Sequence, residues 1–373
     1  MIFSRVLARA RLWISSSQFE ASRSVGRLFH VKRDRDRFSG AIFRWYASQA
    51  ASSLLHNPAF SLMPTDYMYI MKCPQDQPFD NGKISPYGNI ELSPSACVLN
   101  YGQGLLEGLK AFRKENGNLL LFRPEQNAMR MIHGAERMCM TSPTIDQFLD
   151  AVKQTAIANK RWASAGRKRP YPRVGPAPEY TFLIYASPVH NYFKEGTAPL
   201  NLYVEDEFDR ASQGGTGGVK TTSNYAPVMK ALTRAKERGF SDVLYLDSVN
   251  RKNIEEVSAS NIFMRKGNIL STPMARGTIL SGITRRSVIE LSRDLSYQVE
   301  ERQITVEELL EADEIFCTGT AVTIASVGSI TYQNRKVEFK TKGKTACREL
   351  YELLVGIQTG QIEDKHGWVI EID

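Results

Sequence analysis

The chain contains 373 residues, of which 42% are hydrophobic and 24% are charged, and its formal net charge is +8. This composition is typical of globular proteins and excludes collagen-like, disordered and membrane-bundle classes, and no apolar run is long enough to span a bilayer. Most of the net charge lies at the start, because residues 1–55 contain ten Lys and Arg against three Asp and Glu. The rest of the chain has a net charge of +1, so the sequence predicts no nucleic-acid-binding surface.

Residues 1–51 are predicted to be an organellar transit peptide. They are rich in Ser and Arg, poor in acidic residues, and place apolar side chains such as Phe3, Val6 and Ala10 at helical spacing. We interpret this segment as a mitochondrial address, with a plastid address and a disordered arm as the alternatives. The folded part of the chain is expected to begin near residue 52.

Residues 52–188 are predicted to form a small N-terminal α/β domain. Alternating and aromatic stretches predict strands, and apolar residues at helical spacing predict amphipathic helices. The strands are expected at 67–72, 119–122 and 180–185, and the helices at 124–138 and 145–159. Residues 189–199 combine Pro, Gly and polar residues without a period, which is typical of an interdomain loop.

Residues 200–373 are predicted to form a larger C-terminal α/β domain, in which strand and helix patterns alternate. The strands are expected at 200–205, 243–247, 262–265 and 314–318, and the helices at 227–238 and 285–295. The predicted fold class is therefore α/β, with mixed α+β character, in a two-domain architecture.

The most informative segment is Gly214–Lys220, in which four glycines precede a lysine. Glycines let the backbone approach a ligand closely, and a lysine beside them can contact a phosphate or bind a carbonyl cofactor covalently. A nucleotide-binding P-loop matches poorly, because Val219 stands where that motif needs glycine and the next helix is expected no earlier than Asn224. Taken alone, the segment also fits a flexible surface loop with one solvated lysine.

Five further segments carry informative residues in a fixed order. They are Tyr101–Lys110, Leu121–Arg130, Glu255–Phe263, Gly277–Arg285 and Cys317–Ala321. Together with Gly214–Lys220 they resemble the fold-type IV branched-chain aminotransferases, in particular the plant organellar members, from about Ser61 to the C-terminus. The resemblance implies the two-domain fold-type IV architecture and a pyridoxal 5'-phosphate cofactor.

The resemblance also implies an activity. The family transfers the amino group of the branched-chain amino acids Leu, Ile and Val to 2-oxoglutarate by a ping-pong mechanism, which gives branched-chain 2-oxo acids and glutamate. The alternatives are another fold-type IV transaminase or lyase, and a catalytically impaired homologue that retains the fold. A homodimer that binds small-molecule substrates, without nucleic acid or membrane partners, is expected.

Four residues match the family's central positions. Lys220 would hold the cofactor and move a proton between substrate and cofactor. Glu256 matches the carboxylate that keeps the cofactor's ring nitrogen protonated, with Glu255 as a neighbouring decoy. Tyr225 matches the tyrosine that hydrogen-bonds the cofactor's phenolic oxygen, and Arg130 matches the arginine whose planar fork grips the phosphate.

Two turns resemble the backbone cup that completes the family's phosphate site, and a separate group resembles its substrate pocket. The turns contribute Gly282, Ile283, Thr284, Gly319 and Thr320. The implied substrate contacts are Tyr101, Leu106, Lys110, Arg173, Thr320 and Ala321. For Leu106, a plain core position is an equal alternative to a substrate contact.

Residues 166–178 depart from the family pattern, because relatives carry a longer segment there. Tyr171 and Arg173 stand in for a tyrosine and an arginine that shape the substrate end of the site in relatives, although Pro172 weakens any strand between them. This departure motivates the catalytically impaired alternative. The five cysteines lie far apart without C-x-x-C spacing, so no metal site is predicted.

Overall fold

The computed structural model describes residues 64–74, 77–94, 96–114, 116–162, 179–187 and 198–372. These residues lie in one compact unit that spans Leu55–Asp373. The predicted transit peptide, segment 166–178 and most of segment 189–199 lie outside the described residues, so the division into two domains stays a prediction. Among the helices that the structure describes, none combines the length and apolar character needed to cross a membrane.

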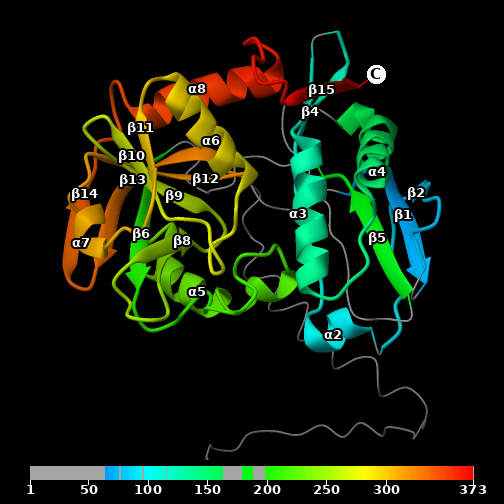
Figure 1. Ribbon diagram of the computed structural model, residues 1–373, viewed down its shortest axis with the longest axis horizontal. Helices are drawn as coiled ribbons and strands as arrows, with labels where there is room; N and C mark the ends of the chain where they lie inside the picture. The colour runs from blue at the N-terminus through cyan, green and yellow to red at the C-terminus, as the bar shows by residue number, and fades with distance from the viewer. Residues whose placement is uncertain are drawn as a thin grey trace, which may run out of the picture. The chain divides into compact units, whose positions relative to one another are not determined.

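An antiparallel sheet of three strands, ordered β2-β1-β5, belongs to the first half of the chain (Figure 1). Its strands are β1 (Tyr67–Pro74), β2 (Lys83–Pro86) and β5 (Glu179–Tyr185). The helix α4 (Ile145–Ala158) packs against it, and the buried rings of Phe148 and Phe182 lie 5.9 Å apart. Thr144 caps this helix by accepting a hydrogen bond from the backbone N–H of Gln147, which fixes where the helix begins.

A second small sheet joins the C-terminus of the chain to its first half. Its order is β15-β4-β3, with β3 (Ala111–Arg113), β4 (Leu119–Phe122) and β15 (Val369–Ile372) all antiparallel. Figure 1 shows the last strand beside β4, above the helix α3 (Pro124–Arg137). Proline at the first position of α3 fits a helix start, because its missing N–H would have no partner there. The short helix α2 (Cys97–Tyr101) precedes these elements.

A mixed sheet of nine strands forms the centre of the second half. The path is β11-β10-β9-β12-β13-β6-β7-β8, and β14 pairs with β13. Three neighbouring pairs are parallel, namely β10 with β11, β13 with β6, and β6 with β7. The strands are β6 (Leu200–Glu205), β7 (Asp242–Leu246), β8 (Ile254–Val257), β9 (Asn261–Lys266), β10 (Ile269–Thr272), β11 (Gln298–Glu301), β12 (Glu314–Gly319), β13 (Thr323–Tyr332) and β14 (Arg335–Glu338).

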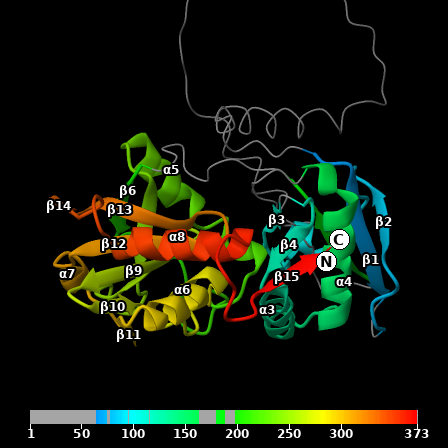
Figure 2. The same cartoon turned by 90° about the horizontal axis from the view of Figure 1, so that it is seen from above.

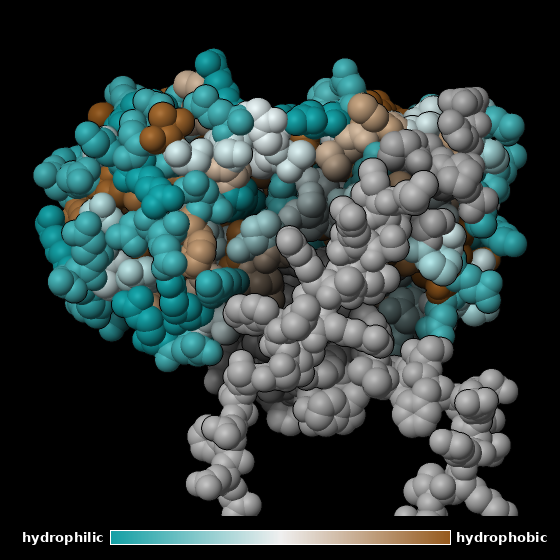
Figure 3. Space-filling view, turned by 90° about the horizontal axis from the view of Figure 1, so that it is seen from below, coloured by the Kyte–Doolittle hydropathy of each residue, from teal (hydrophilic) through white to brown (hydrophobic). Residues whose placement is uncertain are grey.

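Helices cover this sheet. They are α5 (Met229–Glu237), α6 (Ile283–Asp294), α7 (Val306–Leu309) and α8 (Ala346–Thr359), and short 3-10 turns occur at Lys160–Trp162 and Thr222–Asn224. Figure 2 shows α8 over the strands with α6 beside it, and both helices contact β12. The core beneath them contains the stacked rings of Phe263 and Phe316, 5.2 Å apart. On the face that Figure 3 draws, hydrophilic residues predominate over the described surface.

The mixed α/β class predicted from the sequence is confirmed. Every predicted strand and helix is present within about two residues of its expected bounds, and the strands at 119–122 and 200–205 match in full. The helix α8 was not predicted, although Thr345 caps it and Leu350, Leu354 and Ile357 recur at helical spacing on its buried face. The strands β13 and β15 were also missed. In β13, Ser, Thr and Gly interrupt the apolar pattern, and β15 has only four residues and pairs with the distant β4.

One buried carboxylate ties the large sheet to α8. Glu314 on β12 is 0% exposed and accepts hydrogen bonds from the backbone N–H groups of Ala346 and Cys347, at 3.0 and 2.7 Å. Its Oε2 also accepts from Nε of Arg265 at 3.0 Å. The carboxylate therefore satisfies two N–H groups in the first turn of the helix and meets the favourable end of its dipole.

We expect the substitution Glu314→Ala to lower the free energy of unfolding by about 3 kcal/mol or more, because it leaves buried donors and a guanidinium without their partner. Urea unfolding followed by circular dichroism measures this. The control is Glu311→Ala, which removes an ion pair with Lys266 between two well-exposed side chains and should cost less than about 1 kcal/mol. Equal losses in the two variants would contradict the capping role.

Candidate active site

The site begins where two distant chain segments bond to each other. The backbone N–H of Leu106 donates to the carbonyl of Lys220 at 2.9 Å, and the N–H of Thr222 donates to the carbonyl of Gly104 at 2.6 Å. The hydroxyl of Thr221, which is fully buried, donates to the same Gly104 carbonyl at 2.6 Å. These bonds hold the lysine beside the segment that continues into Glu107.

The glycine-rich segment before Lys220 is packed rather than free. A Cβ atom on Gly217 would lie 2.4 Å from the carbonyl oxygen of Thr278, and one on Gly218 would lie 2.8 Å from that of Gly277. The N–H of Gly218 donates to this Gly277 carbonyl at 2.6 Å. Glycine is therefore required at positions 217 and 218, because two backbones meet closely there, whereas Gly214 at the start of the segment is exposed with open space around it.

Lys220 and Tyr225 form a pair inside the site. The Nζ atom of Lys220 donates to the Tyr225 hydroxyl at 3.0 Å. Burial works to raise the pKa of the phenol, but the positive charge of Lys220 and this hydrogen bond outweigh it and lower the pKa of Tyr225 below its ordinary value. The pair therefore presents an amine and a polarised hydroxyl at one point.

Glu256 provides a buried carboxylate from β8 and is 1% exposed. Its Oε1 accepts from the backbone N–H of Leu280 at 2.9 Å, and its Oε2 accepts from Asn261 at 3.1 Å. Burial raises the pKa of Glu256, and the guanidinium of Arg210, 2.8 Å away, opposes that rise. Arg210 is itself buried, and sequence analysis did not identify it because nothing in its local pattern indicates a long-range ion pair.

Glu255 points to a different environment, as alternation along a strand requires. Its Oε1 accepts from the hydroxyl of Thr278 at 2.5 Å, and the residue does not line the pocket described below. The expectation that Glu256 rather than Glu255 faces the site therefore agrees with the geometry.

Arg130 reaches the site from α3. Its Nε and Nη2 atoms donate to the two carboxylate oxygens of Glu107, each at 2.7 Å. Burial opposes the guanidinium charge, but Glu107 holds the pKa of Arg130 above its ordinary value. Sequence analysis did not single out Glu107, although it lies inside the segment 101–110 that carried part of the resemblance.

The N-terminus of α6 faces the same space. Gly282 is its N-cap residue, and a Cβ atom there would lie 2.2 Å from the side-chain oxygen of Asn261, so only glycine fits without a shift. The next two residues are Ile283 and Thr284, whose N–H groups belong to the first helical turn. A helix start of this kind attracts anions through its free N–H groups and its dipole.

The end of β12 and the turn between β12 and β13 form another part of the wall, close to the start of α6. Thr318 is fully buried, and its hydroxyl has no hydrogen-bond partner among the described residues. The turn ends at Thr323, which adopts a positive φ of 64° that is rare for a β-branched residue. Nζ of the buried Lys110 donates to the Thr323 hydroxyl at 2.5 Å, which supports this conformation from the first half of the chain.

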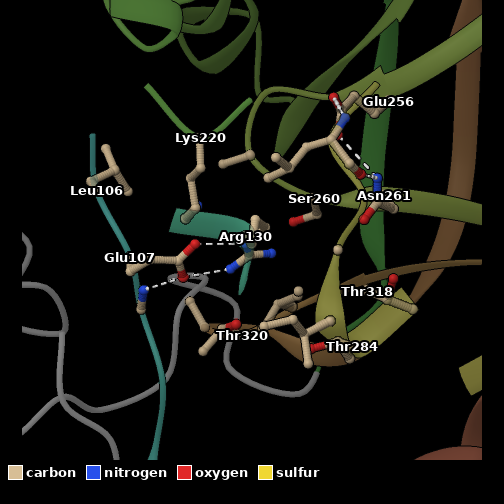
Figure 4. A pocket seen from close by; sticks show the side chains of 18 of the residues that line it. Leu106, Glu107, Arg130, Lys220, Glu256, Ser260, Asn261, Thr284, Thr318 and Thr320 are labelled. Carbon is tan, nitrogen blue, oxygen red and sulfur yellow. Dashed lines mark hydrogen bonds and ion pairs between the residues drawn. The ribbon is translucent and has the colours of Figure 1, made fainter. Parts of the chain in front are cut away.

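These elements enclose a pocket of about 270 Å³ (Figure 4). Figure 4 shows Glu107 and Arg130 joined on one side and Glu256 with Asn261 on another, with Lys220 above the Glu107–Arg130 pair in this view. The predicted residues that line the pocket are Leu106, Arg130, Lys220, Tyr225, Glu256, Gly282, Ile283, Thr284, Gly319, Thr320 and Ala321. The pocket also contains residues that were not predicted, including Glu107, Ser260, Asn261 and Thr318.

Two predicted site residues of the described chain, Tyr101 and Lys110, do not line this pocket. Tyr101 is 81% exposed on α2. Lys110 lines a small neighbouring cavity together with Thr284 and Thr320. Arg173 lies outside the described residues. Arg123 pairs with Glu290 and does not line the pocket.

The donor set fits a molecule with a phosphate at one end and a basic ring nitrogen at the other. The helix start at Gly282 and the guanidinium of Arg130 provide positive potential for a phosphate. Glu256 provides the carboxylate for a protonated nitrogen, and Lys220 provides the amine. The unpartnered hydroxyl of Thr318 is a further polar group at the wall. Among the described residues, no cluster of three His, Cys, Asp or Glu side chains could hold a metal ion.

Sequence comparison gives one matching family and several close relatives. The family model described as Amino-transferase class IV matches residues 104–330. The chain is 62% identical over 326 residues to the mitochondrial branched-chain amino acid aminotransferase 1 of Humulus lupulus, covering 84% of this chain and 83% of that protein. It is 61% identical over 329 residues to the chloroplastic branched-chain-amino-acid aminotransferase 2 of Arabidopsis thaliana, covering 85% of each. A methionine aminotransferase of Arabidopsis thaliana is 51% identical over 327 residues, covering 84% of this chain and 92% of that protein.

Solved structures share the fold. The branched-chain amino acid aminotransferase from Escherichia coli superimposes with a TM-score of 0.69 at 24% identity, covering 82% of this chain and 98% of that chain. The T.th. branched-chain amino acid aminotransferase complexed with N-(5'-phosphopyridoxyl)-L-glutamate gives a TM-score of 0.69 at 24% identity, covering 83% and 99%. At this identity the likeness concerns the fold alone.

Glu255 should make stability depend on pH. Burial raises its pKa from the ordinary 4.5 to about 7, more than the hydrogen bond from Thr278 lowers it. Between these values the folded state holds a proton that the unfolded state releases, so the free energy of unfolding falls as the pH rises through this window. We expect Glu255→Gln to flatten that fall by an amount on the order of 2 kcal/mol.

Urea unfolding at several pH values between 4.5 and 7 measures this slope. The exposed Glu237 supplies the control, because Glu237→Gln should leave the slope unchanged. A slope in Glu255→Gln equal to that of the parent protein would show that this carboxyl does not titrate in the window.

Proposed function

The chain belongs to the class IV aminotransferase family, and on that premise we propose that it is a pyridoxal 5'-phosphate-dependent branched-chain amino acid transaminase. It transfers the amino group of Leu, Ile or Val to 2-oxoglutarate. The family membership that the sequence motifs predicted is confirmed. The observation that carries the proposed activity is the pocket that gathers Lys220, Tyr225, Glu256, Arg130 and the start of α6, in a chain about 60% identical to relatives with this named activity.

Lys220 has the catalytic role in this proposal. Its Nζ atom would hold the cofactor, and its free amine would move a proton at the substrate's α-carbon. The bound cofactor supplies an electron-accepting ring for the electron pair that the departing proton leaves behind. The Tyr225 hydroxyl, which accepts a hydrogen bond from Nζ at 3.0 Å, holds the amine in place.

Glu256 and Arg130 act at opposite ends of the pocket. Glu256 holds a proton at the cofactor's ring nitrogen, which requires a charged carboxylate inside the protein. Arg210 favours that charged form despite burial. At the other end, Arg130 and the N–H groups of Ile283 and Thr284 bind the phosphate.

The substrate side chain is proposed to lie against an apolar wall. Leu106, Leu280, Ala321 and Val322 line the pocket and offer no charged group to an amino acid side chain. Such a wall favours aliphatic substrates over polar ones. A methionine side chain is also apolar, so transamination of methionine or related 2-oxo acids is the second candidate, and the relative with that name supports it.

A homodimer and an organellar location complete the proposal. The curated relatives quoted above are mitochondrial and chloroplastic proteins by name, and residues 1–51 have the composition of a transit peptide. We favour mitochondria over plastids. Imaging of a fluorescent fusion to residues 1–51 and sedimentation of the purified protein test the location and the dimer.

We expect Lys220→Ala to lower kcat for leucine with 2-oxoglutarate by more than about 100-fold, because it removes both the anchor and the proton carrier. Glutamate formation from leucine, isoleucine, valine and methionine measures activity and substrate preference together. Lys365→Ala, which changes an exposed lysine away from the pocket, serves as the control and should retain full activity. A clear preference for methionine would favour the second candidate, and an unimpaired Lys220→Ala variant would refute the assigned mechanism.

A further inference from the structure

The carboxylate of Glu107 is an unexpected feature of the pocket. It is 2% exposed and lies in the segment between the Leu105 bridge and β3. An acidic side chain in a site that binds a phosphate would repel the ligand unless another group offset its charge. The contacts of Glu107 show which groups offset its negative charge.

Glu107 accepts hydrogen bonds from two residues on one face of α3. Nε of Arg130 donates to Oε1 and Nη2 of Arg130 donates to Oε2, both at 2.7 Å. The side-chain amide of Asn127 donates to Oε2 at 2.7 Å, and the backbone N–H of Gly108 lies 3.2 Å from the same oxygen. Asn127 and Arg130 are three residues apart on the helix, so both reach the carboxylate from the same side.

This arrangement leaves one guanidinium nitrogen of Arg130 outside the pair. Glu107 engages one edge of the planar fork through Nε and Nη2, while Nη1 lies 3.4 Å from the carbonyl oxygen of Ser281. Ser281 directly precedes Gly282, the N-cap of α6. The pair with Glu107 therefore orients Nη1 toward the helix start, where the phosphate is proposed to bind. Because Glu107 occupies Nε and Nη2, Nη1 is the guanidinium nitrogen of Arg130 that faces the helix start.

We propose that Glu107 is a positioning residue that fixes the guanidinium of Arg130, so that Nη1 meets the cofactor phosphate beside the N-terminus of α6. The inference rests on the proposed function, because it concerns the phosphate of that cofactor. A long arginine side chain loses rotational freedom when it binds an anion. Glu107 and Asn127 already hold this side chain in one conformation in the folded protein. Binding of the phosphate therefore costs less conformational entropy.

A purely structural role makes a different prediction from a positioning role. If Glu107 only docks α3 onto the segment 104–110, its loss would weaken every ligand of the pocket alike. If it orients Arg130 toward the phosphate, its loss would weaken ligands that carry the phosphate and spare those that lack it. Pyridoxal and pyridoxal 5'-phosphate differ by this group alone.

The experiment measures the dissociation constants of both compounds for the full chain stripped of cofactor, by absorbance titration. In Glu107→Gln we expect binding of pyridoxal 5'-phosphate to weaken by about tenfold or more, the range found when partners that orient a ligand-binding side chain are removed. Binding of pyridoxal should change by less than about threefold. The dissociation constant of pyridoxal divided by that of pyridoxal 5'-phosphate therefore falls.

Glu290→Gln is the matched control. Glu290 also accepts from an arginine, Arg123, with both bonds at 3.2 Å, but it does not line the pocket. This variant should leave both dissociation constants within about twofold of the parent protein, since removing an ion pair away from the ligand changes stability rather than binding. If Glu107→Gln does not yield folded protein, Glu107→Asp retains the charge and shortens the side chain, and it should lower the same ratio.

The outcomes separate the ideas. Equal weakening of both compounds, or no change in either, overturns the positioning role while leaving the proposed function intact. Failure of the parent protein to bind pyridoxal 5'-phosphate overturns the proposed function and this inference with it. A selective loss for the phosphorylated compound, absent from Glu290→Gln, supports the positioning role.

Discussion

The site depends on the backbone pairing between residues 104–106 and 220–222. Two N–H to carbonyl bonds and the buried hydroxyl of Thr221 fix Lys220 next to the segment that carries Glu107. Without this pairing, the Lys220 amine would have no fixed position relative to Glu107 and to Arg130, which Glu107 binds. Binding groups that must act together need such a rigid frame, because small displacements cost large factors in rate.

Buried charge is the second organising principle. At each end of the pocket a carboxylate lies against a guanidinium, Glu107 with Arg130 and Glu256 with Arg210. The roles of the two pairs are opposite. In one the carboxylate orients the arginine, and in the other the arginine opposes the effect of burial, which raises the pKa of the carboxyl. Burying such ion pairs costs free energy. Both pairs lie at the pocket, where ligand binding and catalysis need a charged group at a defined position.

The sequence predicted the elements with strong periodicity and the residues that belong to recognisable segments. It did not predict α8, although the apolar residues of this helix recur at helical spacing. It also did not predict β15, because its partner strand β4 lies far earlier in the chain. Long-range partners also explain the site residues that were missed, because neither Glu107 nor Arg210 carries a local signal of its counterpart. Conversely, Tyr101 was placed in the substrate pocket by resemblance, whereas the described chain leaves it exposed.

We propose that Lys220 and the surrounding pocket carry out both halves of an amino transfer. The most direct test follows the visible absorbance of the purified protein with bound pyridoxal 5'-phosphate while leucine and then 2-oxoglutarate are added. We expect the band of the bound cofactor to fade with leucine and to return with the oxo acid. A band that does not respond to leucine, or no band at all, would contradict this proposal.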